Sequence, residues 1–170
     1  LRCPAMTDWA RCYIGLGANL ANALGSPREH IARAMAAFEQ SADFDQVAVS
    51  SLYQSRAYGV TDQPDFINAV LRAHTTLTPL ALLDFCQALE QAAGRVRVRH
   101  WGERSLDVDV LLYADKVINE PRLTVPHVEL TLRNFVVIPL LELDNAITVN
   151  GQRLAELPAA QDWQGLLTVS

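Results

Sequence analysis

The chain has 170 residues and a mass of 18.8 kDa, with 50% hydrophobic residues, 19% charged residues and a net charge of −5. This length predicts one domain, the hydrophobic share excludes a disordered chain, and the acidic balance disfavours a nucleic-acid binder. No window approaches the roughly 18 continuous apolar residues of a membrane span. Three cysteines, Cys3, Cys12 and Cys86, lack the spacing of a disulfide framework or zinc site, which predicts a cytoplasmic protein.

The first predicted elements are a strand and a helix. An apolar run over 12–16 predicts a strand that enters a loop at Gly15-Leu16-Gly17. Ser26-Pro27-Arg28-Glu29 then combines an N-cap serine, a proline at the first helical position and a glutamate three residues after the cap. With apolar residues at helical spacing behind it, this motif predicts a helix over 27–40.

The pattern then continues with two strands, a second helix and a fourth strand. The predictions are a strand over 47–55, a loop over 56–64, a strand over 65–76, a helix from Thr78-Pro79 to Gly94, a charged loop over 95–104 and a strand over 106–113. The order β-α-β-β-α-β is typical of the ferredoxin-like α+β fold, an antiparallel sheet with helices on one face. Residues 115–170 form a less regular C-terminal extension.

The absence of repeats and linkers predicts a single domain over 1–170. Residues 1–10 lack the apolar stretch of a secretory signal, and Leu1 is not a natural start residue. We expect residues 1–10 to be disordered or a cloning remnant.

The most informative segment is the strand that holds Asp107 and Asp109. Side chains alternate between the two faces of a strand, so both carboxylates share one face, about 6–7 Å apart at the usual strand rise. Such a pair suits Mg²⁺, which one or two carboxylates commonly hold together with phosphate oxygens. The simpler interpretation is a solvent-facing polar alternation, but aspartate is depleted in strands and two on one face need an explanation.

A cluster of arginines precedes this strand and favours the metal interpretation. Arg95, Arg97, Arg99 and Arg104 lie within ten residues, and the guanidinium group is suited to phosphate. Metal ligands beside several phosphate-binding groups predict a site for a polyphosphate such as ATP. The chain has no P-loop motif, and Gly15-Leu16-Gly17-Ala18-Asn19-Leu20 lacks the third glycine of a dinucleotide fingerprint, so we interpret it as a turn.

The order of motifs resembles the 6-hydroxymethyl-7,8-dihydropterin pyrophosphokinase family over roughly residues 12 to 143. The resemblance rests on Tyr13-Ile14-Gly15-Leu16-Gly17-Ala18-Asn19-Leu20, Val49-Ser50-Ser51-Leu52-Tyr53, Asp62-Gln63-Pro64-Asp65-Phe66-Ile67-Asn68-Ala69, Trp101-Gly102-Glu103-Arg104-Ser105-Leu106-Asp107-Val108-Asp109-Val110-Leu111-Leu112, Arg122-Leu123-Thr124-Val125-Pro126-His127 and Arg133-Asn134-Phe135. It implies an enzyme of folate biosynthesis that transfers pyrophosphate from ATP to the hydroxymethyl group of the pterin and releases AMP.

The resemblance also implies roles for individual residues. Asp107 and Asp109 would bind two Mg²⁺ ions and, with Arg95 and Arg104, form the catalytic set. The ATP-binding residues would be Glu90, Arg95, Arg97, Trp101, Arg104, Arg122, Thr124, His127 and Arg133. The pterin-binding residues would be Ser55, Ala57, Tyr58, Phe66, Asn68, Trp101 and Phe135. The segment 95–104 would be a lid over both substrates, and the partners would be ATP and the pterin alone, with no nucleic acid or membrane and with the enzyme a monomer.

The chain departs from the family pattern at a few positions. Ser55-Arg56-Ala57-Tyr58-Gly59 lacks the two prolines that many members have there, and Glu103 and Val128 replace a proline and a tyrosine. These changes leave open a different pterin as the substrate. They also leave open a non-catalytic module that binds pterin or nucleotide, whereas an RNA-binding ferredoxin-like domain is disfavoured by the acidic face of the strand.

Overall fold

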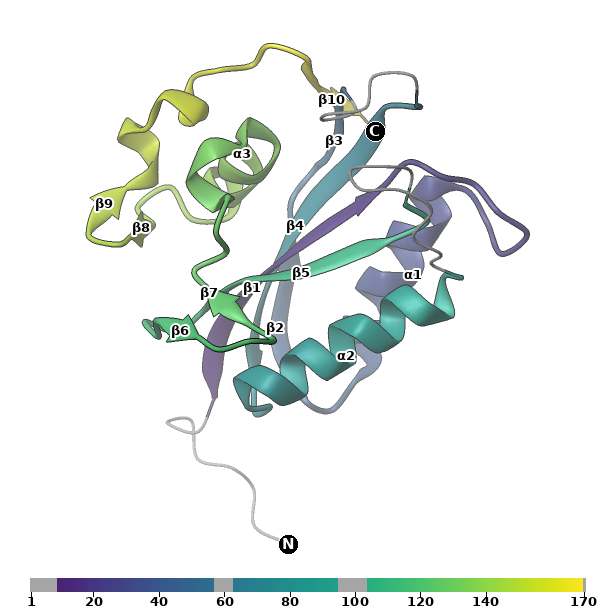
Figure 1. The fold of residues 1–170 in the computed structure, drawn as a ribbon, viewed down its shortest axis with the longest axis horizontal. Helices are drawn as coiled ribbons and strands as arrows, with labels where there is room; N and C mark the ends of the chain where they lie inside the picture. The colour runs from purple at the N-terminus through teal and green to yellow at the C-terminus, as the bar shows by residue number, and fades with distance from the viewer. Residues whose placement is uncertain (1–8, 57–62, 95–103, 170) are drawn as a thin grey trace, which may run out of the picture.

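The structure is a computed structural model that describes residues 9–56, 63–94 and 104–169. In these ranges the chain forms a mixed α/β structure around an antiparallel sheet (Figure 1). The principal elements are β1 (Ala10–Ala18), α1 (Pro27–Gln40), β2 (Phe44–Val49), β3 (Leu52–Ser55), β4 (Phe66–Thr75), α2 (Pro79–Ala92), β5 (Asp107–Tyr113), β6 (Ile118–Asn119), β7 (Thr124–Val125), α3 (Asn134–Leu143), β8 (Thr148–Val149), β9 (Gln152–Arg153) and β10 (Leu166–Val169). None of the described helices is long and apolar enough to cross a membrane.

The main sheet has six strands, and all of its pairings are antiparallel. The strand order is β10-β3-β4-β1-β5, and β2 also pairs with β4, beside β3. The two strands on either side of β1 are therefore β4 and β5, so residues distant in sequence meet across the centre of the sheet. This order decides which side chains can lie opposite one another in a site.

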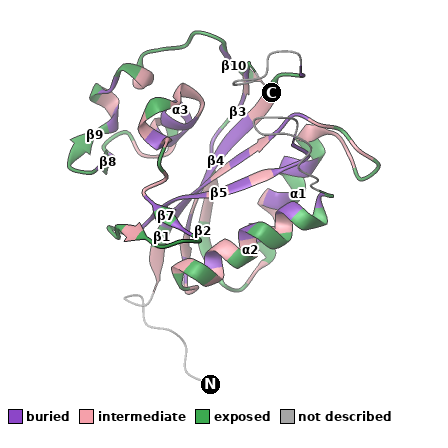
Figure 2. Cartoon of the chain, in the orientation of Figure 1, coloured by how far each residue is buried: buried purple, intermediate pink, exposed green. Residues whose placement is uncertain are grey.

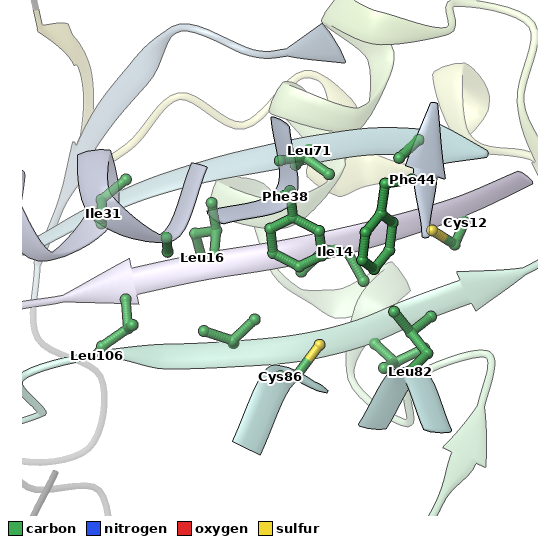
Figure 3. Close-up of a cluster of buried hydrophobic side chains, with 14 of the residues drawn as sticks. Cys12, Ile14, Leu16, Ile31, Phe38, Phe44, Leu71, Leu82, Cys86 and Leu106 are labelled. Atoms are coloured by element: carbon green, nitrogen blue, oxygen red, sulfur yellow. The ribbon is translucent and has the colours of Figure 1, made fainter. Parts of the chain in front are cut away.

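Helices cover both faces of the sheet. On one face α1 and α2 lie next to each other, and their apolar side chains pack with alternate residues of β1, β4 and β5 (Figure 1). Figure 3 shows part of this core, with Phe38 of α1 beside Phe44 and Ile14, and the ring centroids of the two phenylalanines lie 4.8 Å apart. The strands at the centre are buried, whereas the outer sides of the helices are exposed (Figure 2).

The other face carries a second core that α3 and the following segment build. Val137 and Leu140 of α3 pack there against Tyr13 of β1 and Val70 of β4. The expectation of helices on one face therefore holds for α1 and α2 only, because α3 in the C-terminal extension covers the opposite face. Within the sheet, α3 lies mainly against β4 and β3.

The predicted ends of both long helices are confirmed. Ser26 Oγ accepts a hydrogen bond of 3.2 Å from the Glu29 N–H, and the Glu29 carboxylate accepts one of 3.0 Å from the Ser26 N–H, which completes a capping box. Thr78 caps α2, and Gly94 follows the helix with a φ of 75°, a value that glycine adopts without strain.

Two strand predictions were wrong in detail. The predicted strand over 47–55 begins earlier, at Phe44, and divides into β2 and β3 around Ser50-Ser51. The break is stabilised by side chains, because Ser50 Oγ accepts a hydrogen bond of 2.9 Å from the Val70 N–H and the Ser51 N–H donates one of 2.8 Å to Glu142. The Gly15-Leu16-Gly17 segment does not enter a loop but lies inside β1, paired on both sides.

The C-terminal extension completes one edge of the sheet. β10 pairs with β3, where Leu166 lies opposite Ser55. The segment before β10 is held by Asn134 at the start of α3, whose Nδ2 donates hydrogen bonds of 2.8 Å to Asp162 O and 3.3 Å to Gln164 O. The end of the described chain is thus joined to β3 and to α3 at once.

Candidate active site

A row of residues crosses three neighbouring strands on the face that α3 partly covers. Gly17 of β1 lies opposite Asn68 of β4 on one side and opposite Asp107 of β5 on the other. In the next row Gly15 lies between Val70 and Asp109. Because adjacent strands lie about 4.8 Å apart, Asn68 and Asp107 are separated by about 10 Å across a glycine that has no side chain.

Asp107 and Asp109 point to the same face, as predicted. Val108 and Val110 are buried in the core beneath α1 and α2, so strand alternation directs both carboxylates to the opposite face. Within the described ranges, no group of three His, Cys, Asp or Glu side chains could hold a metal ion. Two carboxylates alone suit Mg²⁺, which takes its other ligands from phosphate and water.

Arg104 is buried and close to the first aspartate. Its Nε lies 3.7 Å from Asp107 Oδ1, so the guanidinium partly balances the charge of the two carboxylates. This contact joins the end of the predicted phosphate-binding cluster to the predicted metal site.

Glu90, which the resemblance placed at the nucleotide, contacts the same strand from the other side. It is buried near the end of α2, and Glu90 Oε2 accepts a hydrogen bond of 2.9 Å from the Val108 N–H, between the two aspartates. In the described part of the sheet β5 is an edge strand, so Glu90 satisfies a backbone donor that no described strand reaches.

Three of the predicted pterin-binding residues come together at the β3–β4 pair. Ser55 lies opposite Phe66, and Asn68 Nδ2 donates a hydrogen bond of 2.7 Å to Ser55 Oγ. This bond directs the other end of the Asn68 amide toward β1, where Oδ1 would lie 3.2 Å from a Cβ at Gly17. The acceptor oxygen of Asn68 therefore faces the space above Gly17.

Within the described ranges, the other aromatic residue of the predicted pterin site, Phe135, lies at the start of α3. Phe135 packs against the small core of Tyr53, Ile138 and Leu166, and the Arg133 guanidinium lies 5.5 Å from the centre of its ring. Arg133 also forms an ion pair with Glu129. The N-terminal end of α3 thus carries an aromatic ring with a cation beside it.

His127 lies close to this group. Its backbone N–H donates a hydrogen bond of 3.0 Å to Leu111 O, which fixes it beside β5. Burial and then the positive charge of Arg133 hold the pKa of His127 below its usual value, so the neutral imidazole prevails at pH 7.

Other predicted residues lie elsewhere or outside the described ranges. Arg122 is exposed and donates hydrogen bonds to Asp84 and Gln87 on α2, at 2.6 and 3.2 Å, and Thr124 is exposed on β7. The structure does not place either of them with the two aspartates. The predicted residues outside the described ranges are Ala57, Tyr58, Arg95, Arg97 and Trp101.

Sequence reasoning missed the contribution of the two glycines. Gly15 and Gly17 have the same two-residue spacing as Asp107 and Asp109, and the antiparallel register places each glycine opposite one aspartate. The two-residue spacing shared by the glycines and the aspartates was the available signal that the two pairs lie opposite each other in neighbouring strands.

Comparison with known proteins gives a consistent result. A model of the 7,8-dihydro-6-hydroxymethylpterin-pyrophosphokinase (HPPK) family matches residues 13–145. The chain is 44% identical over 146 residues to the 2-amino-4-hydroxy-6-hydroxymethyldihydropteridine pyrophosphokinase of Haemophilus influenzae, covering 85% of this chain and 89% of that one. It is 45% identical over 157 residues to the enzyme of the same name from Pseudomonas aeruginosa, covering 92% and 94%.

A solved structure supports the fold alone. The crystal structure of a Plasmodium falciparum HPPK-DHPS triple mutant with pteroate is similar with a TM-score of 0.63 and 12% identity, and the match covers 94% of this chain and 46% of that one. This chain therefore spans about half the length of that protein. Together, the family match and the relatives show that the chain belongs to the 6-hydroxymethyl-7,8-dihydropterin pyrophosphokinase family, the diphosphotransferases of folate biosynthesis that use ATP.

Proposed function

We propose that the row Asn68–Gly17–Asp107 is where the two substrates of this pyrophosphokinase meet. Asn68 would bind the pterin, and Asp107 with Asp109 would hold two Mg²⁺ ions on the ATP phosphates. The observation that carries this proposal is the glycine between them, which contributes no side chain of its own between Asn68 and Asp107. The separation of about 10 Å is suited to a pterin on one side and a phosphate chain on the other.

The pterin half of the proposed site has a polar and an aromatic part. The Ser55 hydroxyl fixes the Asn68 amide, so that Asn68 Oδ1 can accept a hydrogen bond from an amino or ring N–H of the pterin. Phe66 and Phe135, which come from β4 and α3, would lie against its two ring faces. Ala57, Tyr58 and Trp101 remain proposed pterin contacts, and the change at 55–59 keeps a related pterin as the alternative substrate.

The phosphate half consists of charged groups. Arg104 lies beside Asp107 and would contact the transferred phosphates, together with Arg95 and Arg97. Magnesium bound at the two aspartates would neutralise phosphate charge. His127, Arg122, Thr124, Arg133 and Glu90 remain the proposed nucleotide contacts.

The reaction needs alignment more than covalent chemistry from the protein. The hydroxymethyl oxygen of the pterin loses its proton to solvent and forms a bond to the β-phosphorus of ATP, the bond from that phosphorus to the α-phosphate oxygen breaks, and AMP leaves with the electron pair. The side chains of the row would hold the two substrates in line and stabilise the charge that develops on the phosphates.

We also propose a ferredoxin-like topology and one domain for the described chain. The antiparallel order of β3, β4, β1 and β5, with α1 and α2 on one face, supports the topology, and the addition of β10 to the same sheet supports the single domain. The free buried thiols of Cys12 and Cys86 support a location in the reducing cytoplasm. We propose further that the enzyme acts as a monomer and binds no nucleic acid.

The test compares two variants in an assay that measures AMP and pterin diphosphate by mass-resolved chromatography. Asn68→Ala should raise the KM for the pterin and leave the affinity for MgATP nearly unchanged, because only the pterin half loses a contact. Asp107→Asn should lower kcat by orders of magnitude and alter the dependence on Mg²⁺. Asp115→Asn, at an exposed position just after β5, is the matched control.

Two results would contradict the proposed site. The same change in both KM values for Asn68→Ala would mean that the two substrates are not divided between β4 and β5. Binding of MgATP and pterin to the wild-type chain without release of AMP would instead support the non-catalytic module.

A further inference from the structure

One buried side chain connects three segments around the proposed site. Asn19 follows β1 directly and is 2% exposed. Asn19 Oδ1 accepts a hydrogen bond of 2.8 Å from the Arg104 N–H, and Asn19 Nδ2 donates bonds of 2.8 Å to Gln63 Oε1 and to Pro64 O. The segment 19–20 also binds through its backbone, because the N–H groups of Asn19 and Leu20 donate to Arg104 O at 2.9 and 3.0 Å.

The residues that Asn19 connects belong to opposite halves of the site. Arg104 lies three residues before Asp107, on the phosphate side. Pro64 lies two residues before Phe66 and four before Asn68, on the pterin side. The strand pairing in the row Asn68–Gly17–Asp107 sets the distance between these halves within the sheet. At the end of β1, the side-chain bonds of Asn19 hold the two halves together a second time.

The amide of Asn19 supplies both the acceptor and the donors that this set of bonds needs. The Arg104 N–H is a donor and Pro64 O is an acceptor, so they require an oxygen on one side of the Asn19 side chain and an N–H on the other. Aspartate would keep the bond from Arg104 but place an oxygen against Pro64 O. Alanine would lose all three side-chain bonds and leave buried polar groups without partners.

We propose that Asn19 is a positioning residue that sets the placement of the pterin half relative to the phosphate half. It would not contact either substrate. It would instead hold Arg104 and the start of β4 at a fixed separation, so that the hydroxymethyl oxygen and the β-phosphorus meet in line. This inference rests on the proposed function, and it assigns to Asn19 an effect on turnover in the ternary complex rather than on the binding of either substrate alone.

The experiment compares Asn19→Asp with the wild-type chain by steady-state kinetics and by calorimetric binding of each substrate alone. We expect kcat to fall about 10- to 100-fold, the effect of a misplacement of about 1 Å. The Kd of MgATP and the Kd of the pterin, each measured without the other substrate, should change by less than about threefold. If the role of Asn19 were only structural, Asn19→Asp would lower the unfolding temperature without this selective loss of kcat.

Asn22→Asp is the matched control. Asn22 lies in the same connection and makes a similar set of bonds, with Nδ2 on Ala93 O at 2.8 Å and Oδ1 accepting from the Leu24 N–H at 2.9 Å. It contacts neither Arg104 nor the segment 63–64 in these bonds, so this variant should lower the unfolding temperature and keep kcat.

Gln63→Leu is the second variant, in case Asn19→Asp does not fold. It removes one acceptor on the pterin side and leaves the bonds to Arg104 in place, so we expect a smaller loss of kcat with both Kd values maintained. Unchanged kcat in the folded variants of an active wild-type chain would overturn the role of Asn19 alone. A wild-type chain that forms no AMP would overturn the proposed function and, with it, this inference.

Discussion

Glu90 Oε2 lies 2.9 Å from the backbone nitrogen of Val108, the residue between Asp107 and Asp109. The bond connects the last turns of α2 to an edge strand and fixes the backbone from which both aspartates project. The carboxylate therefore has a structural partner within the protein, in addition to any part that it takes in binding ATP.

Replacing Glu90 should affect stability as well as activity. Glu90→Ala removes the acceptor of a buried N–H, and we expect the free energy of unfolding to fall by about 1–3 kcal/mol. Glu90→Gln keeps an acceptor oxygen, so its free energy of unfolding should fall by less. Urea unfolding measures both, with the exposed Gln91→Ala on the same helix as the control. A stability equal to that of the wild-type chain in Glu90→Ala would show that the bond to Val108 contributes nothing measurable.

Adding a methyl group at Gly17 should selectively weaken pterin binding. The new Cβ would lie 3.2 Å from Asn68 Oδ1, so the Asn68 amide would have to move away from its position above residue 17. We expect the KM for the pterin to rise about 5- to 100-fold, the equivalent of about 1–3 kcal/mol. In Gly15→Ala the Cβ meets only the Leu111 side chain, at 3.4 Å, and the rise should be smaller. An equal rise of the KM for the pterin in both variants would contradict a specific requirement for glycine at position 17.

His127 should contribute to the loss of stability in mild acid. Its pKa in the folded chain is below the ordinary value of about 6.5, so below that pH the unfolded chain takes up a proton that the folded chain does not. The free energy of unfolding should therefore be constant above about pH 6.5 and decrease as the pH falls. His127→Gln should flatten this decrease, while the lowered pKa of His30 keeps part of it in both proteins. Urea unfolding at pH 5 to 8 is the measurement, and parallel curves would refute the assignment.

Loss of the Asn134 side chain should disturb the pterin side from the outer edge of the sheet. Asn134→Ala removes two hydrogen bonds to the segment 162–164, and each contributes about 0.5–1.5 kcal/mol to stability. Since Phe135 and Leu166 belong to the same small core, we expect a higher KM for the pterin and an unchanged KM for ATP. The exposed Asn145→Ala is the control. A change confined to the KM for ATP would contradict this coupling.

Much of the site was predictable because local rules decide it. Strand alternation was enough to place Asp107 and Asp109 on one face, and cap chemistry was enough to place the start of α1 and both ends of α2. The pterin-binding residues came from the resemblance alone; Ser55, Phe66 and Asn68 lie together at the β3–β4 pair, and their binding role stays a prediction.

What could not be predicted depends on contacts between distant segments. Gly15 and Gly17 resemble turn residues locally, and only the pairing of β1 with both β4 and β5 makes them strand residues. The polar residues around Phe44 do not predict a strand, so the sequence pattern missed the early start of β2. The packing of the Phe44 ring against Phe38 and Phe85 stabilises that start. Asn19 has no distinguishing mark in the sequence, because its partners lie far from it along the chain.

The pairing of β10 with β3 has a consequence for how the protein is made. Leu166 and Ser55 are neighbours in the sheet although more than a hundred residues separate them in the chain. β10 leaves the ribosome after every other described strand, so the edge of β3 stays open while the rest of the sheet can already form. An open edge is a template for pairing with another chain, and contacts at long sequence separation form slowly. Synthesis therefore completes the outer edge of β3, next to the proposed pterin residues, after the rest of the sheet.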